Sequence, residues 1–199
     1  NTDFRKKMWK APEGSMLDGQ TEYLTSAAFG NFGDRLADYA SVKFRPAEGN
    51  CDDYTTGAAT AYPLMRVEEM YFIEAEAAAH SNAEEGKSLL TNFMLNNRDE
   101  QYKMTAASAD EIIEEIIFQK RIELWGEGLT FFDIKRLNMP VTRGYSGTNY
   151  QDDARYNTTT RPAWMSFCIV QTEKNNNAAL IGFENPEVAD ELYTPWAGN

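Results

Sequence analysis

Carboxylates in one short stretch of the chain could carry acid and base chemistry. The stretch QKRIELWGEGLTFFDIKR, residues 119–136, contains Glu123, Glu127 and Asp133. A glycoside hydrolase needs two carboxyl groups about 5 to 10 Å apart across the scissile bond. The stretch also contains lysines and arginines, which would lower the pKa of a neighbouring carboxyl group, whereas a general acid needs a raised pKa. The pattern therefore favours ion pairs, and we predict no catalytic residue.

The chain offers little else for nucleophilic or metal chemistry. His80 is the only histidine and lies near the end of a predicted helix. Interaction with the helix dipole explains a histidine at that position without a catalytic role. Cys51 and Cys168 fall in no metal-binding spacing, which leaves open one disulfide or two free thiols. The loops NCDDYTTG and NYQDDARYN match no EF-hand, and solvated acidic loops are favoured over cation sites. We predict no metal site and no cofactor.

Charge and composition limit the class of protein. The formal net charge of −12 repels nucleic-acid phosphates and anionic lipid headgroups, so we expect no nucleic-acid partner. A chain of 199 residues with 42% hydrophobic residues can bury a core. No apolar stretch is long enough to span a bilayer.

Helical periodicity dominates the middle of the chain. Four helices are expected, over residues 63–80, 81–98, 108–128 and 129–137. Pro63 suits a first helical turn, and Ser108 with Glu111 has the spacing of a capping box. Gly126 and Gly128 mark the end of the third helix or a kink in it. The first two helices should form a hairpin of the tetratricopeptide type, although no second copy of such a repeat is present.

Irregular segments flank this helical body. We expect loops over residues 1–61, with one short strand through Tyr39 and Ser41 to Phe44, and loops over residues 140–199, with one short strand in WMSFCIV, residues 164–170. The predicted fold class is mostly α: a helical-hairpin body at residues 62–139 with long irregular loops and a few short strands.

Charged residues recur on two of the predicted helices. Arg66, Glu69 and Glu76 share one stripe of the first helix, and Arg121 and Glu123 lie on the third. Cross-helix pairing would neutralise charges that neither helix could bury alone. We predict a mostly buried ion-pair network of these five residues.

Several segments together resemble a known family. They are YPLMRVEEMYFIEAEA, then LNNRD, then IIFQKRIELWGEGLTFFDIKR and, near the end, FENPE. In order and spacing they resemble the C-terminal half of the SusD/RagB family, the nutrient-binding lipoproteins of the outer membrane of Bacteroidota. The resemblance is clear over residues 62–139, and it extends upstream to DFRKKMW and YASVKF. Val170 stands where the family has proline, which changes the expected shape of that loop.

The resemblance implies a function and a location. Residues 1–199 would be a single, partial domain of the family, without the signal peptide and lipidated cysteine with which family members begin. The protein would bind a glycan or peptide nutrient at the cell-surface side of the outer membrane and hand it to a SusC-like TonB-dependent transporter, without chemistry. Contact with the membrane would run only through the lipid anchor that this chain lacks. The alternative is a helical docking module that binds a protein and no sugar.

No sugar-binding residue carries over from the family motifs, so the site must be argued from aromatic residues. Flat rings stack on the apolar faces of sugars, while polar side chains bind the hydroxyl groups. The candidate ligand-binding residues are Trp9, Tyr145, Tyr150, Tyr156 and Trp164, with part of the binding face in residues 144–164. For each ring taken alone, ordinary loop packing is the alternative.

Overall fold

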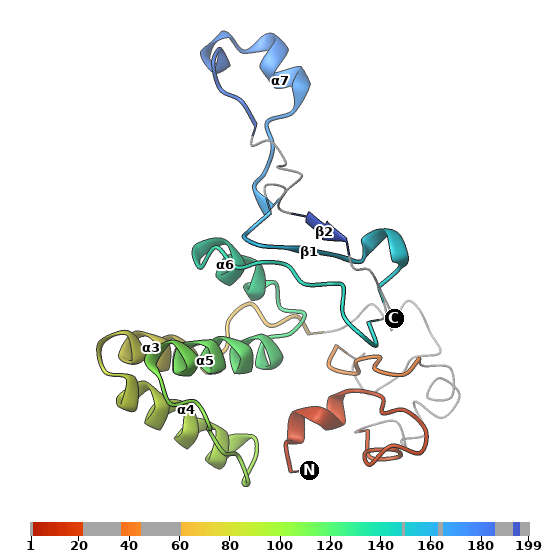
Figure 1. The fold of residues 1–199 in the computed structure, drawn as a ribbon, viewed down its shortest axis with the longest axis vertical. Coiled ribbons are helices and arrows are strands. Elements are labelled where there is room, and N and C mark those ends of the chain that lie inside the picture. The colour runs from red at the N-terminus through yellow and green to blue at the C-terminus, as the bar shows by residue number, and fades with distance from the viewer. Residues whose placement is uncertain are drawn as a thin grey trace. The chain divides into compact units, whose positions relative to one another are not determined.

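The fold is mostly helical (Figure 1). The computed structural model describes residues 2–21, 37–44, 61–148, 150–162, 165–185 and 193–195. Internal contacts divide the chain into two compact units, Asn1–Glu127 and Gly128–Asn199. None of the described helices has the length and apolar character needed to cross a membrane.

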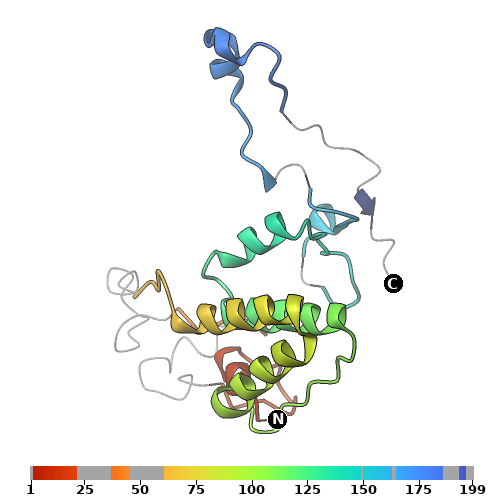
Figure 2. The same ribbon diagram turned by 90° about the vertical axis from the view of Figure 1, so that its left-hand side faces the viewer.

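Three helices build the core of the first unit: α3 (Val67–Ser81), α4 (Ala83–Asn97) and α5 (Ala109–Glu123). They pack side by side in both views (Figures 1 and 2). The core consists of buried residues from all three helices: Phe72, Ala75, Ala79, Leu90, Phe93, Met94, Ile112 and Ile116. The predicted hairpin of the first two helices is therefore present, and the third helix covers it.

Gly86 allows α3 and α4 to approach closely. It is buried in α4, and a Cβ atom at this position would lie 2.5 Å from Ala79 Cβ and 2.7 Å from the Ala75 carbonyl oxygen. Neither atom can move aside easily, because one is a backbone oxygen of α3 and the other is a Cβ atom attached directly to that backbone. A hydrogen atom in place of a side chain thus sets the distance between the two helices.

Local signals placed most helix ends correctly. The side chain of Asn82 caps α4 by accepting a hydrogen bond from Glu85 N, and the predicted capping box of Ser108 and Glu111 is complete at α5. After α5 the chain turns at Gly126 and Gly128, both with positive φ, before α6 (Leu129–Arg136) begins. The α6 prediction is confirmed to within one residue, whereas α5 ends at Glu123, before the predicted end at residue 128.

The predicted start of the first helix is wrong. Pro63 lies outside α3, and Arg66 is extended, with φ −132° and ψ 146°. Met65, in the same predicted first turn, is 79% exposed. Proline tolerates a first helical turn but does not enforce one, and the guanidinium of Arg66 is held by carboxylates described below.

Strands contribute little to the fold. In the second unit, β1 (Tyr156–Thr158) pairs antiparallel with β2 (Tyr193–Pro195). The strand expected around residues 39–44 is reduced to a single bridge between Trp9 and Ser41. Among the described residues, the other short elements are the 3-10 helices η1 (Phe4–Met8), η3 (Asp152–Ala154) and η5 (Ala178–Leu180), and the helix α7 (Gln171–Asn176).

The strand predicted in WMSFCIV is wrong for its described part, residues 165–170. The backbone N–H of Ile169 donates to Asn185 Oδ1 at 2.8 Å, and Asn185 Nδ2 donates to the Ile169 carbonyl at 2.9 Å. A side-chain amide thus takes the hydrogen bonds that a neighbouring strand would have taken. This pairing closes a loop that contains α7 and η5.

Candidate functional site

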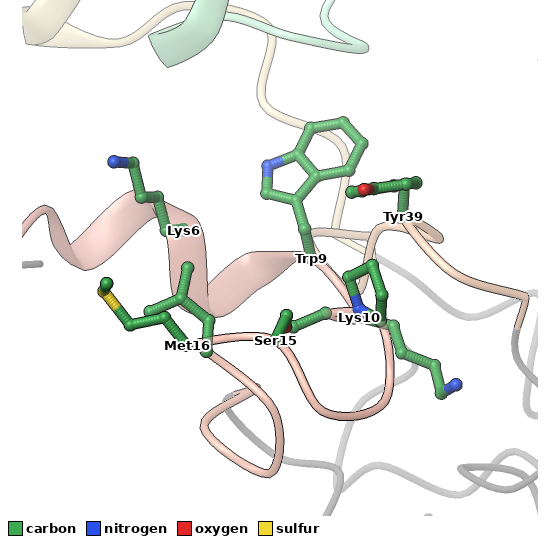
Figure 3. Close-up of a pocket in the computed structure, with 9 residues that line it drawn as sticks. Lys6, Trp9, Lys10, Ser15, Met16 and Tyr39 are labelled. Carbon is green, nitrogen blue, oxygen red and sulfur yellow. The ribbon is translucent and has the colours of Figure 1, made fainter. Parts of the chain in front are cut away.

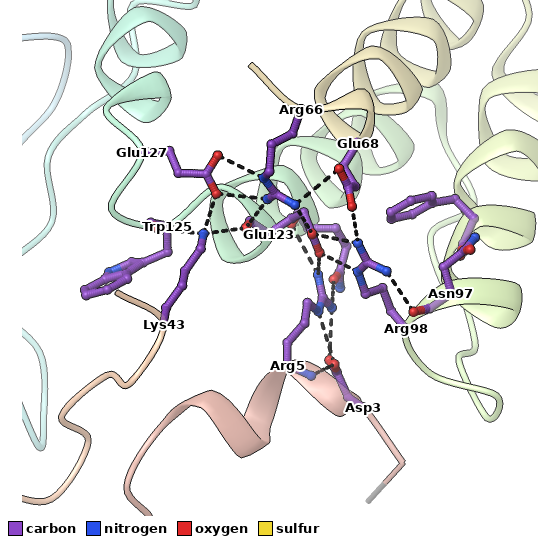
Figure 4. Close-up of polar contacts among 12 residues, drawn as sticks. Asp3, Arg5, Lys43, Arg66, Glu68, Asn97, Arg98, Glu123, Trp125 and Glu127 are labelled. Carbon is purple, nitrogen blue, oxygen red and sulfur yellow. Dashed lines mark hydrogen bonds and ion pairs between the residues drawn. The ribbon is translucent and has the colours of Figure 1, made fainter. Parts of the chain in front are cut away.

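A dense group of charges surrounds the C-terminal end of α5 (Figure 4). We call it the Glu123 cluster; its members are Asp3, Arg5, Lys43, Arg66, Glu68, Arg98, Glu123 and Glu127. Arg98 donates to Glu123 through Nε and Nη2, both at 2.8 Å, and Arg66 Nη1 donates to Glu123 Oε1 at 3.1 Å. Glu123 is therefore held by one arginine at the start of α3 and by another just after the end of α4.

Glu127 extends the cluster beyond the helix end. Arg66 donates to both of its carboxylate oxygens, at 2.9 and 3.0 Å. Lys43 donates to Glu127 Oε1 at 2.5 Å and to the carbonyl oxygens of Glu123 and Trp125 at 2.9 and 2.8 Å. Lys43 thus binds the last carbonyl of α5 and a carbonyl just beyond the helix, where the backbone lacks partners within the helix.

All five residues of the predicted ion-pair network lie in the described part of the chain. The structure brings Arg66 and Glu123 together, but Arg121 is exposed, because residues two apart on a helix point in different directions. Glu69 is half-buried and makes no ion pair with another described residue within 4.0 Å. Glu76 is buried, with His80 Nε2 3.9 Å away.

Helix periodicity missed the cations that replace Arg121. Arg5, Lys43 and Arg98 lie in η1, in a loop and just after α4, where no helical stripe could reveal them. Arg98 belongs to the LNNRD segment of the family resemblance, so that segment was the available signal. The correct network joins five stretches of chain rather than two helices.

The electrostatics argue against acid and base chemistry at this cluster. Burial opposes the ionisation of Glu123, but the hydrogen bonds and charges of Arg98 and Arg66 outweigh it and lower the pKa of Glu123 below its ordinary 4.5. A carboxylate with a lowered pKa at neutral pH is a poor general acid. The cluster is suited to holding segments together.

This lowered pKa predicts how stability depends on pH. A carboxyl group whose folded pKa lies below its unfolded value contributes stability above the unfolded value and loses it as pH falls through the folded value. We expect the free energy of unfolding to decrease below about pH 4.5 and Glu123→Gln to flatten that decrease. Urea denaturation from neutral pH to about pH 3 measures both profiles. An equally steep loss of stability at acid pH in the two proteins would contradict a lowered pKa for Glu123.

A separate hollow of about 390 Å³ lies beside η1 (Figure 3). Its lining residues are Lys6, Trp9, Lys10, Ala11, Pro12, Ser15, Met16, Leu17 and Tyr39. Small-molecule sites typically measure about 300 to 1,000 Å³, so a sugar unit would fit. Trp9 was predicted as a ligand-binding residue, whereas Tyr39 was assigned only to a short strand.

Backbone pairing places both rings at this hollow. Lys10 N donates to the Ala40 carbonyl at 2.8 Å, and Tyr39 N donates to the Lys10 carbonyl at 2.7 Å. Trp9 packs edge-on against Trp125, with ring centroids 4.5 Å apart. Two segments about 30 residues apart in sequence thus meet with their aromatic side chains on one hollow.

Tyr39 has an unusual backbone conformation. Its φ is 65°, in the left-handed region that bulky residues rarely adopt, and the residue is 64% exposed. Strained backbone of this kind concentrates at ligand-binding sites. Nothing about burial explains a tyrosine here, which makes the hollow the stronger candidate site.

The predicted tyrosines of the second unit form a smaller group. The guanidinium of Arg143 lies over the rings of Tyr150 and Tyr156, 5.1 and 5.0 Å from their centroids. Tyr145 is half-exposed nearby in sequence, and Trp164 lies outside the described residues. The structure brings together two of the four residues predicted in this region.

Within the described residues, no group of three histidine, cysteine or acidic side chains is arranged to hold a metal ion. The acidic loop at residues 50–57 and Cys51 lie outside the described part of the chain, and Cys168 is an exposed free thiol.

Comparison with known proteins connects the fold and the motifs. The model of the SusD family matches residues 38–195. The chain belongs to the SusD family. This match confirms the resemblance that the sequence segments indicated. No curated protein matched the chain.

A solved structure shares the SusD-family fold. The chain is similar to a SusD-like carbohydrate binding protein from Bacteroides vulgatus ATCC 8482, with a TM-score of 0.54 and 23% sequence identity. The match covers 89% of this chain and 38% of that protein. The chain therefore spans less than half the length of this SusD-like structure.

Proposed function

We propose that this chain binds a carbohydrate in the hollow beside η1. The observation that carries the proposal is the meeting of Trp9 and Tyr39 on one open hollow with Lys6, Lys10 and Ser15. Aromatic rings stack on the C–H faces of sugars, and a few polar groups fix their orientation. The family membership and the carbohydrate-binding neighbour in the SusD fold support the same conclusion.

The protein would act by binding alone. The best acid and base candidates, Glu123 and Glu127, are occupied by arginine and lysine side chains. The ligand would then be passed on unchanged, and we propose a SusC-like TonB-dependent transporter as the recipient. In this role the protein would act at the cell-surface side of the outer membrane.

Loss of the Tyr39 ring should weaken carbohydrate binding. We expect Tyr39→Asn to lower the affinity about tenfold, because one stacking ring contributes about 1 to 2 kcal/mol at an open site. Asparagine tolerates positive φ better than most residues, so the backbone should remain in place. Titration calorimetry with a panel of soluble oligosaccharides measures the affinity, and the melting temperature checks the fold.

Tyr62→Asn is the matched control, since Tyr62 is about as exposed as Tyr39 and does not line the hollow. It should bind like the parent protein. Tyr145, Tyr150, Tyr156 and Trp164 remain a second proposed sugar-binding face. Normal binding by Tyr39→Asn, together with loss of binding by Tyr150→Asn, would move the site to that face.

Protein docking is the second candidate function. Val67, Met70 and Tyr71 of α3 are exposed and follow the i, i+3, i+4 spacing typical of a helix contact surface. A protein that binds no member of the oligosaccharide panel would favour this alternative.

A further inference from the structure

The hollow beside η1 has walls that are more apolar than an ordinary sugar requires. Beyond its two rings it is lined by Ala11, Pro12, Met16 and Leu17. Met16 is 79% exposed, so it is not part of a hydrophobic core and is accessible to a ligand in the hollow. A ligand that fills the hollow should therefore carry an apolar group that packs against these walls.

The loop that supplies these walls is held in shape by its own hydrogen bonds. Thr21 is buried and joins the two ends of the loop: its hydroxyl donates to the Trp9 carbonyl at 2.8 Å and accepts from Ala11 N at 3.4 Å. Within the loop, Gly14 N donates to Asp18 Oδ2 at 2.8 Å. A wall fixed before binding costs little ordering when a ligand arrives.

Few polar groups are available to a ligand in this hollow. Ser15 offers a hydroxyl, and Lys6 and Lys10 offer ammonium groups, of which that of Lys10 already lies 3.3 Å from Asp38. A hexose with every hydroxyl free would press some of them against the apolar wall, where they would lose water without gaining a partner. A methyl group in the same place would gain from leaving water.

We propose that the hollow selects a sugar that carries a methyl-bearing substituent, such as an N-acetylated or 6-deoxy sugar. One ring face would stack on the aromatic pair, and the methyl group would lie against Met16 and Leu17. This proposal rests on the proposed carbohydrate binding and adds the class of sugar.

The test compares matched glycan pairs on the full chain. Chito-oligosaccharides and cello-oligosaccharides of equal length share their linkage and differ in the N-acetyl group, and L-fucosides and L-galactosides differ only in the hydroxyl group at carbon 6. These pairs belong to the same oligosaccharide panel used for Tyr39→Asn. We expect the methyl-bearing member of at least one pair to bind about fourfold tighter or more, the gain from burying one methyl-sized group.

Met16→Ser separates the wall from the rings. The exposed position of Met16 makes unfolding an unexpected result, and a melting temperature equal to that of the parent confirms this. The variant should lose the preference for the methyl-bearing sugar and keep the affinity for its unsubstituted partner.

The outcomes distinguish the two proposals. Binding that depends on Tyr39 but shows no preference within any pair, or a preference that survives Met16→Ser, overturns the sugar class and leaves carbohydrate binding in place. An absence of binding across the panel overturns both.

Discussion

Replacing Arg98 by Met is expected to lower the free energy of unfolding by about 3 kcal/mol. Arg98 makes two hydrogen bonds to Glu123 at 2.8 Å and one to Glu68 at 3.0 Å, and its guanidinium also covers the ring of Phe93. Its side chain is 14% exposed and that of Glu123 only 5%. Methionine would keep the apolar contact but leave a buried carboxylate with fewer partners, and such losses typically cost about 3 to 5 kcal/mol.

Arg121→Met is the matched control, because it makes the same substitution two residues from Glu123. Arg121 is exposed, so the change should alter the free energy of unfolding by no more than about 0.5 kcal/mol. Urea denaturation of both variants gives the comparison. Equal losses in the two variants would contradict the proposed architecture of the Glu123 cluster.

Gly86→Ala should destabilise the protein even though alanine favours helices. In an exposed helix this substitution would gain about 1 kcal/mol. Here the new Cβ atom would collide with Ala79 Cβ and the Ala75 carbonyl, and forcing two helices apart typically costs about 1 to 3 kcal/mol or more. We expect a net loss of about 2 kcal/mol, measured by thermal and urea unfolding.

Ser88→Ala tests whether the loss comes from packing. Ser88 is exposed on the same helix, so alanine should be neutral or slightly stabilising there. A Gly86→Ala protein as stable as the Ser88→Ala protein would show that α3 and α4 are not in close contact at Gly86.

Sequence patterns predicted the helical body because its signals are local. The asparagine cap at Asn82 and the capping box at Ser108 act within a few residues and begin α4 and α5 as predicted, and the two glycines follow the end of α5. The start of α3 was misplaced because Arg66 is held extended by carboxylates far away in sequence. The local helix preference is overridden where a side chain distant in sequence fixes the backbone in an extended conformation.

The candidate site was less predictable for the same reason. Trp9 could be proposed from its type, but Tyr39 joins it only through backbone pairing between two irregular segments. Periodicity placed Arg121 in the ion-pair network, whereas loops supply Lys43 and Arg98 instead. Helix periodicity predicts which residues share one face of a helix, but it does not predict which loop residues contact that face.

A crystal structure of the protein with a bound oligosaccharide from the panel would show where the sugar binds. We expect a sugar ring in the hollow beside η1, in contact with the rings of Trp9 and Tyr39. A sugar bound instead against Tyr150 and Tyr156, with the hollow beside η1 empty, would contradict it.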